Sequence, residues 1–434
     1  MTDDGDLAAW ASSVSRRDIP ASARHAARRL LLDQMGICLG GLRLWGVHPA
    51  ETALGIAGEP SATSWSTGRG RLAPYAVLAN RAAGDWLELL AGPECVLAAI
   101  AAAEISDASV GELLETLVIA TEVEGDVRRT LGPGAERHGL HPPAVAGAAG
   151  AATAVGLLIG HDETRLRDAL SAALCLTPAS PYVAFAEGVS GKTLYGALSQ
   201  LTGTWMALLA SGGIGGPATV LTGRRGLRQA LLDGEPGPPL FAPPSGPGRW
   251  AVEQIAFKPF PCSRAAHPAL TALDDLGPLT AETIDSVEIA TYAFAAALDA
   301  RTRGDTPIAA QLSIRHAVAL TILDGALDPA ASFTRTRLSD SRVQALADRI
   351  TVRPTTDYPD TPNRVRRARV IVRLHDGRTL EAERGSRWAL ESPAPDEALR
   401  ARFDRLTGNL RRPDPWTAAD DVKVRALTAE IGGG

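Results

Sequence analysis

The stretch AVAGAAGAATAVGLLIG, residues 144–160, is the longest apolar run of the chain. A helix that crosses a membrane needs about 20 apolar residues in succession. This run is shorter than that, and it consists largely of alanine and glycine, whose small side chains let neighbouring helices approach closely. We therefore predict that these residues form a buried helix inside a folded protein and not a membrane span.

Segments on both sides of this run are also rich in alanine and apolar on most faces, which is typical of helices packed in a large bundle. The predicted helices cover residues 21–39, 75–90, 95–105, 111–131, 143–159, 163–174 and 191–210. We expect residues 1–250 to form a large all-helical domain. The glycines and prolines of GEPGPPLFAPPSGPG, residues 234–248, favour a linker at its end.

The pattern changes after this linker, where short alternating segments favour strands. The predicted strands cover residues 286–292, 349–353, 368–374 and 379–383, and the last two are joined through His-Asp-Gly as in a hairpin. Helices fit residues 308–323, 341–348 and 396–406. We expect a smaller α+β domain over residues 251–394 and a return of residues 395–434 to the helical domain. The fold class is thus mainly α with α+β.

Composition limits the classes of function. The 434 residues suffice for two domains, and 45% hydrophobic with 21% charged residues is ordinary for a soluble globular protein. A formal net charge of −5 gives no reason to expect binding to nucleic acid or to an acidic membrane. The opening MTDDGDLAAW is acidic where a signal peptide would be basic, so we expect a cytoplasmic protein.

Lysine is rare in this chain. The 44 basic residues include only three lysines, Lys192, Lys258 and Lys423. The first two each follow a predicted loop and precede a helical segment, so both could point into a cleft. A lysine is a compact charge that can hold a carboxylate, and burial can lower its pKa toward proton transfer. The alternative is that both are ordinary surface residues.

The run AEGVSGKT, residues 186–193, ends like a phosphate-binding P-loop. Ala186 replaces the first glycine of that motif, and the preceding PASPYVAF is a poor buried strand. We therefore do not expect a nucleotide site, and Lys192 needs another explanation.

Histidines are also few, eight in all, and four lie in informative segments: His138, His141, His267 and His316. A single histidine is more often a hydrogen-bonded structural group than a catalyst. The chain has no HExxH or two-Cys-two-His spacing and no GxSxG motif. Lysines and histidines without a cofactor signature suit anion binding and acid–base chemistry beside a carboxylate.

The four cysteines are far apart in the sequence and predict neither a disulfide framework nor a metal site. They are Cys38, Cys95, Cys175 and Cys262.

Six blocks, taken in order, resemble the MmgE/PrpD family, which includes 2-methylcitrate dehydratase, cis-aconitate decarboxylase and iminodisuccinate epimerase. The resemblance covers nearly the whole chain. The blocks are IPASARHAARRLLLDQMGICLGG, GLHPPAVAGAAGAATAVGLLIG, GKTLYGALSQLTGTWMALLASGGIGGPATVLTGRRGL, FKPFPCSRAAHPAL, AQLSIRHAVALTILDG and VIVRLHDGRTLEAE.

The resemblance implies a large helical domain and a smaller α+β domain, usually in a homodimer, with the active cleft between the domains. It also implies an enzyme without metal or organic cofactor that binds di- or tricarboxylates through basic residues. Such an enzyme removes a proton next to a carboxylate, or carbon dioxide. Carried over by position, its catalytic residues here would be His141, Lys192 and Lys258.

The sequence also departs from the family pattern. Family members usually carry an acidic stretch of the type ALDFDD followed by His-Pro-Ser, whereas this chain has ANRAAGDWLELLAGPECVLAAIAAAE, residues 79–104. Glu88 falls at the first acidic position, but Leu90 and Ala91 replace the next acids and the histidine is missing. That wall of the site should be more apolar. We therefore expect a substrate other than a citrate-type tricarboxylate.

Two further positions differ. His316 stands where many members carry tyrosine, and Ser263 stands where some carry histidine. We expect His316 and His141 to be the general acid and base, with Lys192 and Lys258 stabilising an enolate-like intermediate.

The expected substrate-binding residues are Glu88, His138, Cys262, Ser263 and Arg264. Packing alone also accounts for Cys262, and a surface position for Arg264.

Three hypotheses follow. The first is a cofactor-independent lyase or isomerase that dehydrates, decarboxylates or epimerises a carboxylate or carbonyl compound. The second is an enzyme of secondary metabolism, such as a cyclase, epimerase or dehydratase, acting on a larger and less charged intermediate. The third is a binding or scaffold protein that kept the fold and lost the reaction.

Overall fold

The structure is a computed structural model of the chain. It describes residues 4–46, 61–177, 180–232, 244, 246, 248–302, 304–359, 366–390, 392–408, 414–429 and 431. The predicted linker at 234–248 lies largely outside the described residues.

The N-terminal part is mainly helical. Its α-helices are α1 (Asp4–Ser13), α2 (Ala21–Trp45), α4 (Ala73–Asp85), α5 (Val96–Ile105), α6 (Val110–Arg137), α7 (Pro142–Leu158), α8 (Glu163–Cys175), α9 (Val183–Ala186), α10 (Tyr195–Ser211) and α11 (Leu227–Leu231). Its 3-10 helices are η1 (Arg16–Asp18), η2 (Ser190–Leu194) and η3 (Ala251–Gln254), and its strands are β1 (Ala62–Ser64) and β2 (Arg69–Arg71).

The C-terminal part mixes helices and strands. Its strands are β3 (Ile284–Thr291), β4 (Ile350–Pro354), β5 (Arg367–Leu374) and β6 (Thr379–Gly385). Its helices are α12 (His267–Asp274), α13 (Ala293–Arg301), α14 (Pro307–Leu312), α15 (Ile314–Asp324), α16 (Arg335–Leu338), α17 (Ser341–Ala347), α18 (Asp396–Thr407) and α19 (Val424–Thr428). The expected fold class, mainly α with α+β, is confirmed.

Helix α7 is the buried helix that the alanine- and glycine-rich run predicts. All its residues from Ala144 to Gly156 are buried, and it packs mainly against α6 and α10. The approach to α10 is close: a Cβ placed on Gly203 would lie 2.4 Å from the backbone oxygen of Ala148. Small residues are therefore required where these two helices meet.

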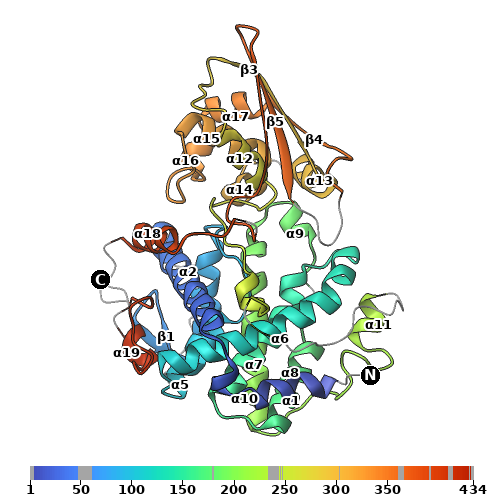
Figure 1. Ribbon diagram of the computed structural model, residues 1–434, viewed down its shortest axis with the longest axis vertical. Coiled ribbons are helices and arrows are strands. Elements are labelled where there is room, and N and C mark those ends of the chain that lie inside the picture. The colour runs from blue at the N-terminus through green and yellow to red at the C-terminus, as the bar shows by residue number, and fades with distance from the viewer. Residues whose placement is uncertain are drawn as a thin grey trace.

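The sheet of the smaller part has the strand order β4-β3-β5-β6. Strand β4 runs parallel to β3, and the other neighbours are antiparallel. Figure 1 shows this sheet at one end of the molecule, with α12, α15 and α17 near it and the helical bundle at the other end. Each part has its own large apolar core.

Helix α18 packs against α2, although the two lie at opposite ends of the sequence. Arg402 on α18 forms a buried ion pair with Asp33 on α2 and donates a hydrogen bond to the backbone oxygen of Lys258. These contacts support the expected division of the chain, which we propose: a helical domain, a smaller domain, and a C-terminal segment that returns to the helical domain.

Three local features differ from the sequence-based expectations. The helix expected over 75–90 ends at Asp85 in α4, and Glu88 adopts a left-handed backbone with φ of 50°. The helix expected over 308–323 is divided at Ser313, whose hydroxyl caps α15 by accepting from the backbone N–H of His316. The β1–β2 hairpin was not expected in the helical region.

Within the described residues, no helix is both long enough and apolar enough to cross a membrane.

Candidate active site

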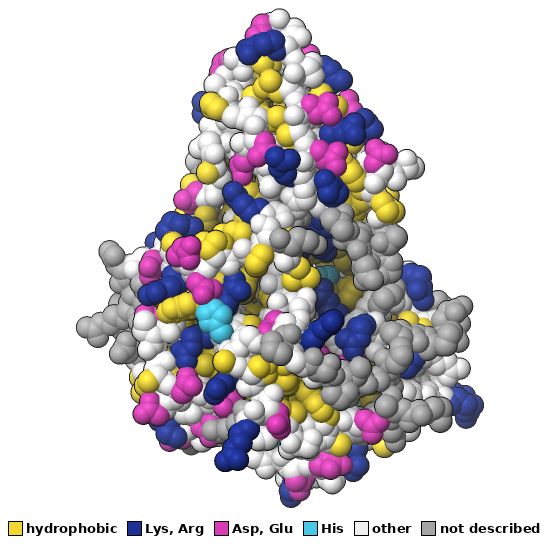
Figure 2. Space-filling model, in the orientation of Figure 1, with side chains coloured by type: hydrophobic (Ala, Val, Ile, Leu, Met, Phe, Trp, Pro, Cys, Tyr) yellow, Lys and Arg dark blue, Asp and Glu magenta, His cyan; other side chains and the backbone are white. Residues whose placement is uncertain are grey.

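A cavity of about 1620 Å³ lies where the two parts of the molecule meet. Its walls come from the segment after α4, from α6 and the start of α7, from the loop before α12, and from the ends of β5 and β6. Figure 2 shows lysine and arginine side chains gathered around the hollow between the two parts. Segments far apart in the chain, namely α4, α6, η2, the loop before α12 and the region of β5 and β6, thus bring basic groups to one space.

Glu88 lies between the two predicted lysines. Lys258 Nζ donates to the Glu88 backbone oxygen at 2.7 Å and to its Oε1 at 2.8 Å. Lys192 Nζ donates to Glu88 Oε2. All three side chains are buried, with exposed fractions of 5% for Glu88, 7% for Lys192 and 6% for Lys258. The left-handed turn at Glu88 allows both its carbonyl and its carboxylate to face Lys258.

The charges of this triad shift one another's pKa. Burial alone would raise the pKa of Glu88, but the two ammonium groups lower it far below its ordinary value. Burial would likewise lower the pKa of Lys192, but Glu88 raises it. For Lys258, burial and the charges of Lys192 and Arg264 outweigh Glu88, so its pKa is lowered. Lys258 is therefore the lysine that gives up a proton more readily.

His141 occupies the N-cap position of α7, where its side chain makes no capping hydrogen bond, and it lines the same cavity. Its ring packs on three aromatic rings, with centroids 5.8 Å from Tyr182, 6.0 Å from Phe185 and 5.6 Å from Tyr195. Burial, followed by the charge of Lys192, lowers the pKa of His141 to about 3. Its Nδ1 has no hydrogen-bond partner among the described residues. The imidazole is therefore neutral at neutral pH and able to accept a proton.

A second buried polar cluster lies beside the triad, and the sequence-based reasoning missed it. Arg81 Nη1 lies 2.6 Å from Asp85 Oδ2, and Arg81 Nη2 lies 2.6 Å from Glu94 Oε2. Both carboxylate oxygens of Glu124 accept from the backbone N–H of Glu94, at 2.9 and 2.8 Å. Arg81, Asp85, Glu94 and Glu124 all line the cavity. Charged residues inside the alanine-rich stretch of α4 were the available signal.

Glycines on the neighbouring helices make room for this cluster. A Cβ on Gly147 would lie 2.4 Å from the Glu94 Cβ, and one on Gly150 would lie 2.5 Å from Glu124 Oε2. A Cβ on Gly196 would lie 2.3 Å from Glu94 Oε2. The small residues of α7 therefore serve the buried carboxylates as well as helix packing.

The charges at this end of the cavity do not balance. Three buried cations meet four buried carboxylates: Arg81, Lys192 and Lys258 with Asp85, Glu88, Glu94 and Glu124. One proton on a carboxyl group would balance these buried groups, and the exposed Arg128 adds a positive charge that also acts on Glu124. Glu124 is suited to hold the proton, because burial and then the charge of Glu94 raise its pKa to about 8.

The remaining predicted site residues divide into two groups. Ser263 and Arg264 line the cavity. His267, which was not predicted as a site residue, lines it as well, and its Nε2 lies 3.2 Å from the Cys262 backbone oxygen. The Cys262 thiol is buried outside the cavity lining, and burial raises its pKa, which makes it a packed cysteine and a poor nucleophile.

Two predicted histidines are not brought to the cavity. His138 is exposed at the end of α6. His316 is buried in α15, and its Nδ1 lies 2.9 Å from Ser313 Oγ within the smaller part. The expected pairing of His316 with His141 therefore finds no support in the geometry, because His141 lines the cavity and His316 does not.

In the described part of the chain, no group of three or more His, Cys, Asp and Glu residues could hold a metal ion.

Comparison with known proteins agrees with this architecture. The family model of the MmgE/PrpD N-terminal domain matches residues 5–238, and that of the MmgE/PrpD C-terminal domain matches residues 260–421. The chain belongs to the MmgE/PrpD family. This MmgE/PrpD protein is also similar to the cis-aconitate decarboxylase of Aspergillus terreus, with 23% identity over 441 residues, covering 93% of this chain and 89% of that protein. A decarboxylase is a lyase, so the family to which the chain belongs contains lyases.

Proposed function

We propose that this MmgE/PrpD protein is a lyase or isomerase that performs acid–base chemistry at a carbon next to a carboxylate. The observation that carries the proposal is the meeting of the buried Lys192, Lys258 and Glu88 with a neutral His141 in one cavity. The similarity to a cis-aconitate decarboxylase supports the same class of reaction.

The lysines provide the electrostatic part of this chemistry. Removal of a proton or of carbon dioxide next to a carboxylate leaves negative charge on the carboxylate oxygens. Ammonium groups fixed in a buried site stabilise that charge more strongly than water does, because they need no reorganisation. Glu88 holds Lys192 and Lys258 in position before the substrate arrives.

The proton is handled by two groups close to the lysines. We propose His141 as the general base, since its neutral imidazole has an Nδ1 free to accept a proton. Glu124 is the proposed proton store, because its carboxyl group lines the cavity and keeps its proton near neutral pH. No step in this scheme requires a cofactor.

The size of the cavity favours the second hypothesis on the substrate. Ligand cavities usually measure about 300–1,000 Å³, and this one is larger at about 1620 Å³. Leu90, Ala91 and Gly92 line it, as expected from the altered acidic segment. Many arginines line it as well, so a larger substrate need not be less charged.

We also propose the homodimer that the family resemblance implies, which light scattering would test.

Turnover of a panel of di- and tricarboxylic acids by the wild type and by Lys258→Ala tests the proposal. Lys423→Ala is the matched control, because Lys423 is the exposed third lysine and lies against Asp107 outside the cavity. We expect conversion by the wild type and by Lys423→Ala, and its loss in Lys258→Ala with the fold retained by circular dichroism. Equal rates in all three proteins would exclude the proposed role of Lys258.

A further inference from the structure

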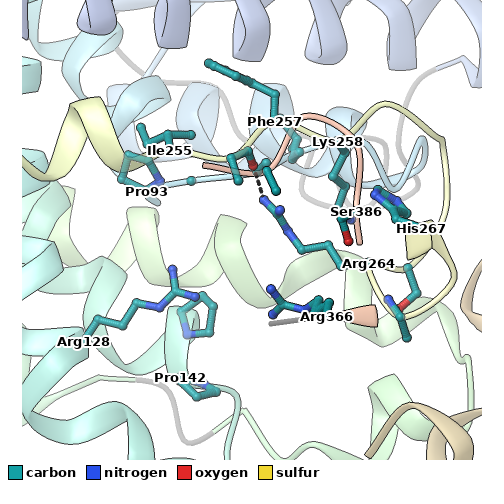
Figure 3. A pocket seen from close by; sticks show the side chains of 18 of the residues that line it. Pro93, Arg128, Pro142, Ile255, Phe257, Lys258, Arg264, His267, Arg366 and Ser386 are labelled. Atoms are coloured by element: carbon teal, nitrogen blue, oxygen red, sulfur yellow. Dashed lines mark hydrogen bonds between the residues drawn. The ribbon is translucent and has the colours of Figure 1, made fainter. Parts of the chain in front are cut away.

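The segment that carries Lys258 has no regular structure of its own. Residues 256–259 lie between η3 and α12 and belong to neither a helix nor a strand. No backbone–backbone hydrogen bond joins these residues to any other described residue, and Pro259 has no N–H to donate. Figure 3 shows Phe257 and Lys258 of this segment at the cavity, which both of them line. Side chains from other segments must therefore fix the place of Lys258.

Two arginine side chains hold the backbone of this segment. Arg264 Nη2 donates to the backbone oxygen of Ala256, and Arg402 Nη1 donates to that of Lys258. Hydrogen bonds from a charged donor are about twice as strong as those between neutral groups. Lys258 is thus held at both ends, because its Nζ donates to Glu88 while its backbone oxygen accepts from Arg402.

Arg402 is itself held by contacts with two other segments. It lies on α18 with an exposed fraction of 5%, and it forms an ion pair with the buried Asp33 of α2. Its guanidinium carbon also lies 5.1 Å from the centroid of the Trp388 ring, which lines the cavity. Burial, followed by the charge of Arg405, lowers the pKa of Arg402 to about 9, so the group stays charged at neutral pH. One buried cation thus joins α2, α18 and the cavity wall.

We propose that Arg402 is a positioning residue, which fixes the Lys258 ammonium group in the cavity by holding the Lys258 backbone oxygen. This inference rests on the proposed function for the role of Lys258. Among the described residues that line the cavity, Lys258 is present and Arg402 is not, so Arg402 acts without touching the substrate. A misplacement of about 1 Å can lower a catalytic rate about 100-fold. The hydrogen bond from Arg402 should therefore affect turnover through Lys258 alone.

The scarcity of lysine allows a direct test, because the chain has only Lys192, Lys258 and Lys423. Lysine labelled with ¹³C at Cε gives one NMR signal for each of them, and Lys258→Ala and Lys423→Arg assign the signals. The first test variant is Arg402→Gln. The second combines Arg402→Gln with Asp33→Asn, which removes both charges and so leaves no buried aspartate without its partner. The spectra are recorded without substrate.

Arg43→Gln is the matched control. Arg43 also joins α2 to α18, with Nε 2.6 Å from the Leu406 backbone oxygen and Nη2 2.9 Å from that of Arg405. It does not line the cavity. Its loss loosens the packing of the two helices but spares the hydrogen bond from Arg402 to Lys258. A change common to Arg43→Gln and Arg402→Gln therefore reports helix packing alone.

We expect both Arg402 variants to move the Lys258 signal and to leave the Lys423 signal in place. On an acid that the wild type converts, their kcat should fall about 10- to 100-fold, while KM stays within about threefold because Arg402 touches no substrate. Arg43→Gln should keep the wild-type Lys258 signal, kcat and KM.

An unmoved Lys258 signal in both Arg402 variants would overturn the proposal, and so would a wild-type kcat in variants whose signal has moved. The same shift in Arg43→Gln would also overturn it, because helix packing would then be the cause. The NMR signals need no turnover, so they separate this inference from the proposed function. A wild type that converts no acid would contradict the proposed function, and the Lys258 signal would still decide whether Arg402 positions Lys258.

Discussion

Lys258 Nζ contacts Glu88 twice, at 2.7 Å from its backbone oxygen and at 2.8 Å from its carboxylate. The second contact makes Glu88 a shared counter-ion, since its other carboxylate oxygen accepts from Lys192. Two buried ammonium groups would repel each other without it. The pairing explains how the chain keeps two lysines in an apolar environment and close to one another.

Glu88→Gln should therefore destabilise the protein. Loss of the carboxylate leaves two buried cations without a charged partner, and breaking a buried ion pair in this way costs about 3–5 kcal/mol. Chemical denaturation measures the effect. Glu187→Gln, at an exposed glutamate, is the control and should change stability by less than about 0.5 kcal/mol. Equal stability of the two variants would show that Glu88 does not carry this charge balance.

The contacts of Glu88 with the two lysines also predict that the folded protein loses stability at acid pH. The folded-state pKa of Glu88 lies below its ordinary value of 4.5. Its contribution to stability is therefore present above about pH 4.5 and is lost as the pH falls through the folded-state pKa. The loss of stability on acidification should be shallower in Glu88→Gln than in the wild type. Parallel curves for the two proteins would contradict this.

Arginine should not replace either cavity lysine. Lys192→Arg and Lys258→Arg keep the positive charge, but the planar guanidinium is larger, cannot lose its proton and needs more donors satisfied. We expect turnover to fall at least about 100-fold, a size typical of losing one electrostatic contact to the transition state. Lys423→Arg, at the exposed lysine, should retain full turnover. Active Lys192→Arg and Lys258→Arg variants would show that charge alone suffices.

The low pKa of His141, about 3, determines the expected pH dependence. Its imidazole is neutral from pH 5 to pH 8, so the base form is fully populated over the whole range, while the low pKa makes it a weak base. We therefore expect that protonation of His141 causes no decline of kcat/KM near pH 6.5. The kcat/KM of the wild type, measured from pH 5 to pH 8 on an acid that is turned over, would check this. A wild-type decline near pH 6.5 would mean that His141 is charged more easily than its surroundings imply.

Glu124 should make the protein less stable at higher pH. Folding raises its pKa from 4.5 to about 8, so the folded state holds the proton more tightly than the unfolded state does. Stability therefore decreases as the pH rises from about 4.5 to about 8, by about 1.4 kcal/mol for each tenfold difference in proton affinity. Denaturation at several pH values should show this slope in the wild type and a flatter one in Glu124→Gln. An unchanged slope would place the proton elsewhere.

Gly147, which lies against the buried Glu94, should not tolerate a larger residue. In Gly147→Ala the new Cβ would lie 2.4 Å from the Glu94 Cβ, so α7 or Glu94 must shift, at a cost of about 1–3 kcal/mol. Gly132→Ala on α6 is the matched control, because its Cβ would meet its nearest atom at 3.5 Å. That change should be neutral or stabilising by up to about 1 kcal/mol. Equal thermal stabilities would contradict the close packing.

Some of this site could be predicted from the sequence, because it rests on local motifs. The scarcity of lysine and the family-like blocks pointed to Lys192, Lys258 and His141, and the altered acidic segment pointed to Glu88. The buried helix α7 followed from its small residues. Each of these signals lies within one short stretch of the chain.

Other features depend on tertiary contacts that no local pattern shows. The pairing of Glu94 with Arg81 and Glu124 requires three segments to meet, and charged residues in helices usually indicate an exposed face. The hydrogen bond from Arg402 to Lys258 likewise joins two distant parts of the chain. His316 is the opposite case: it lies in a family-like block of the sequence, but its side chain does not line the cavity.

The most direct test of the account is hydrogen exchange at carbons next to carboxylates. The wild type, Lys258→Ala and Lys423→Ala would each be incubated in D₂O with a panel of di- and tricarboxylic acids and followed by NMR. We predict deuterium incorporation or carbon dioxide release from at least one acid with the wild type and Lys423→Ala, and neither with Lys258→Ala. Absence of both for every acid, or equal rates in all three proteins, would contradict the proposed acid–base chemistry.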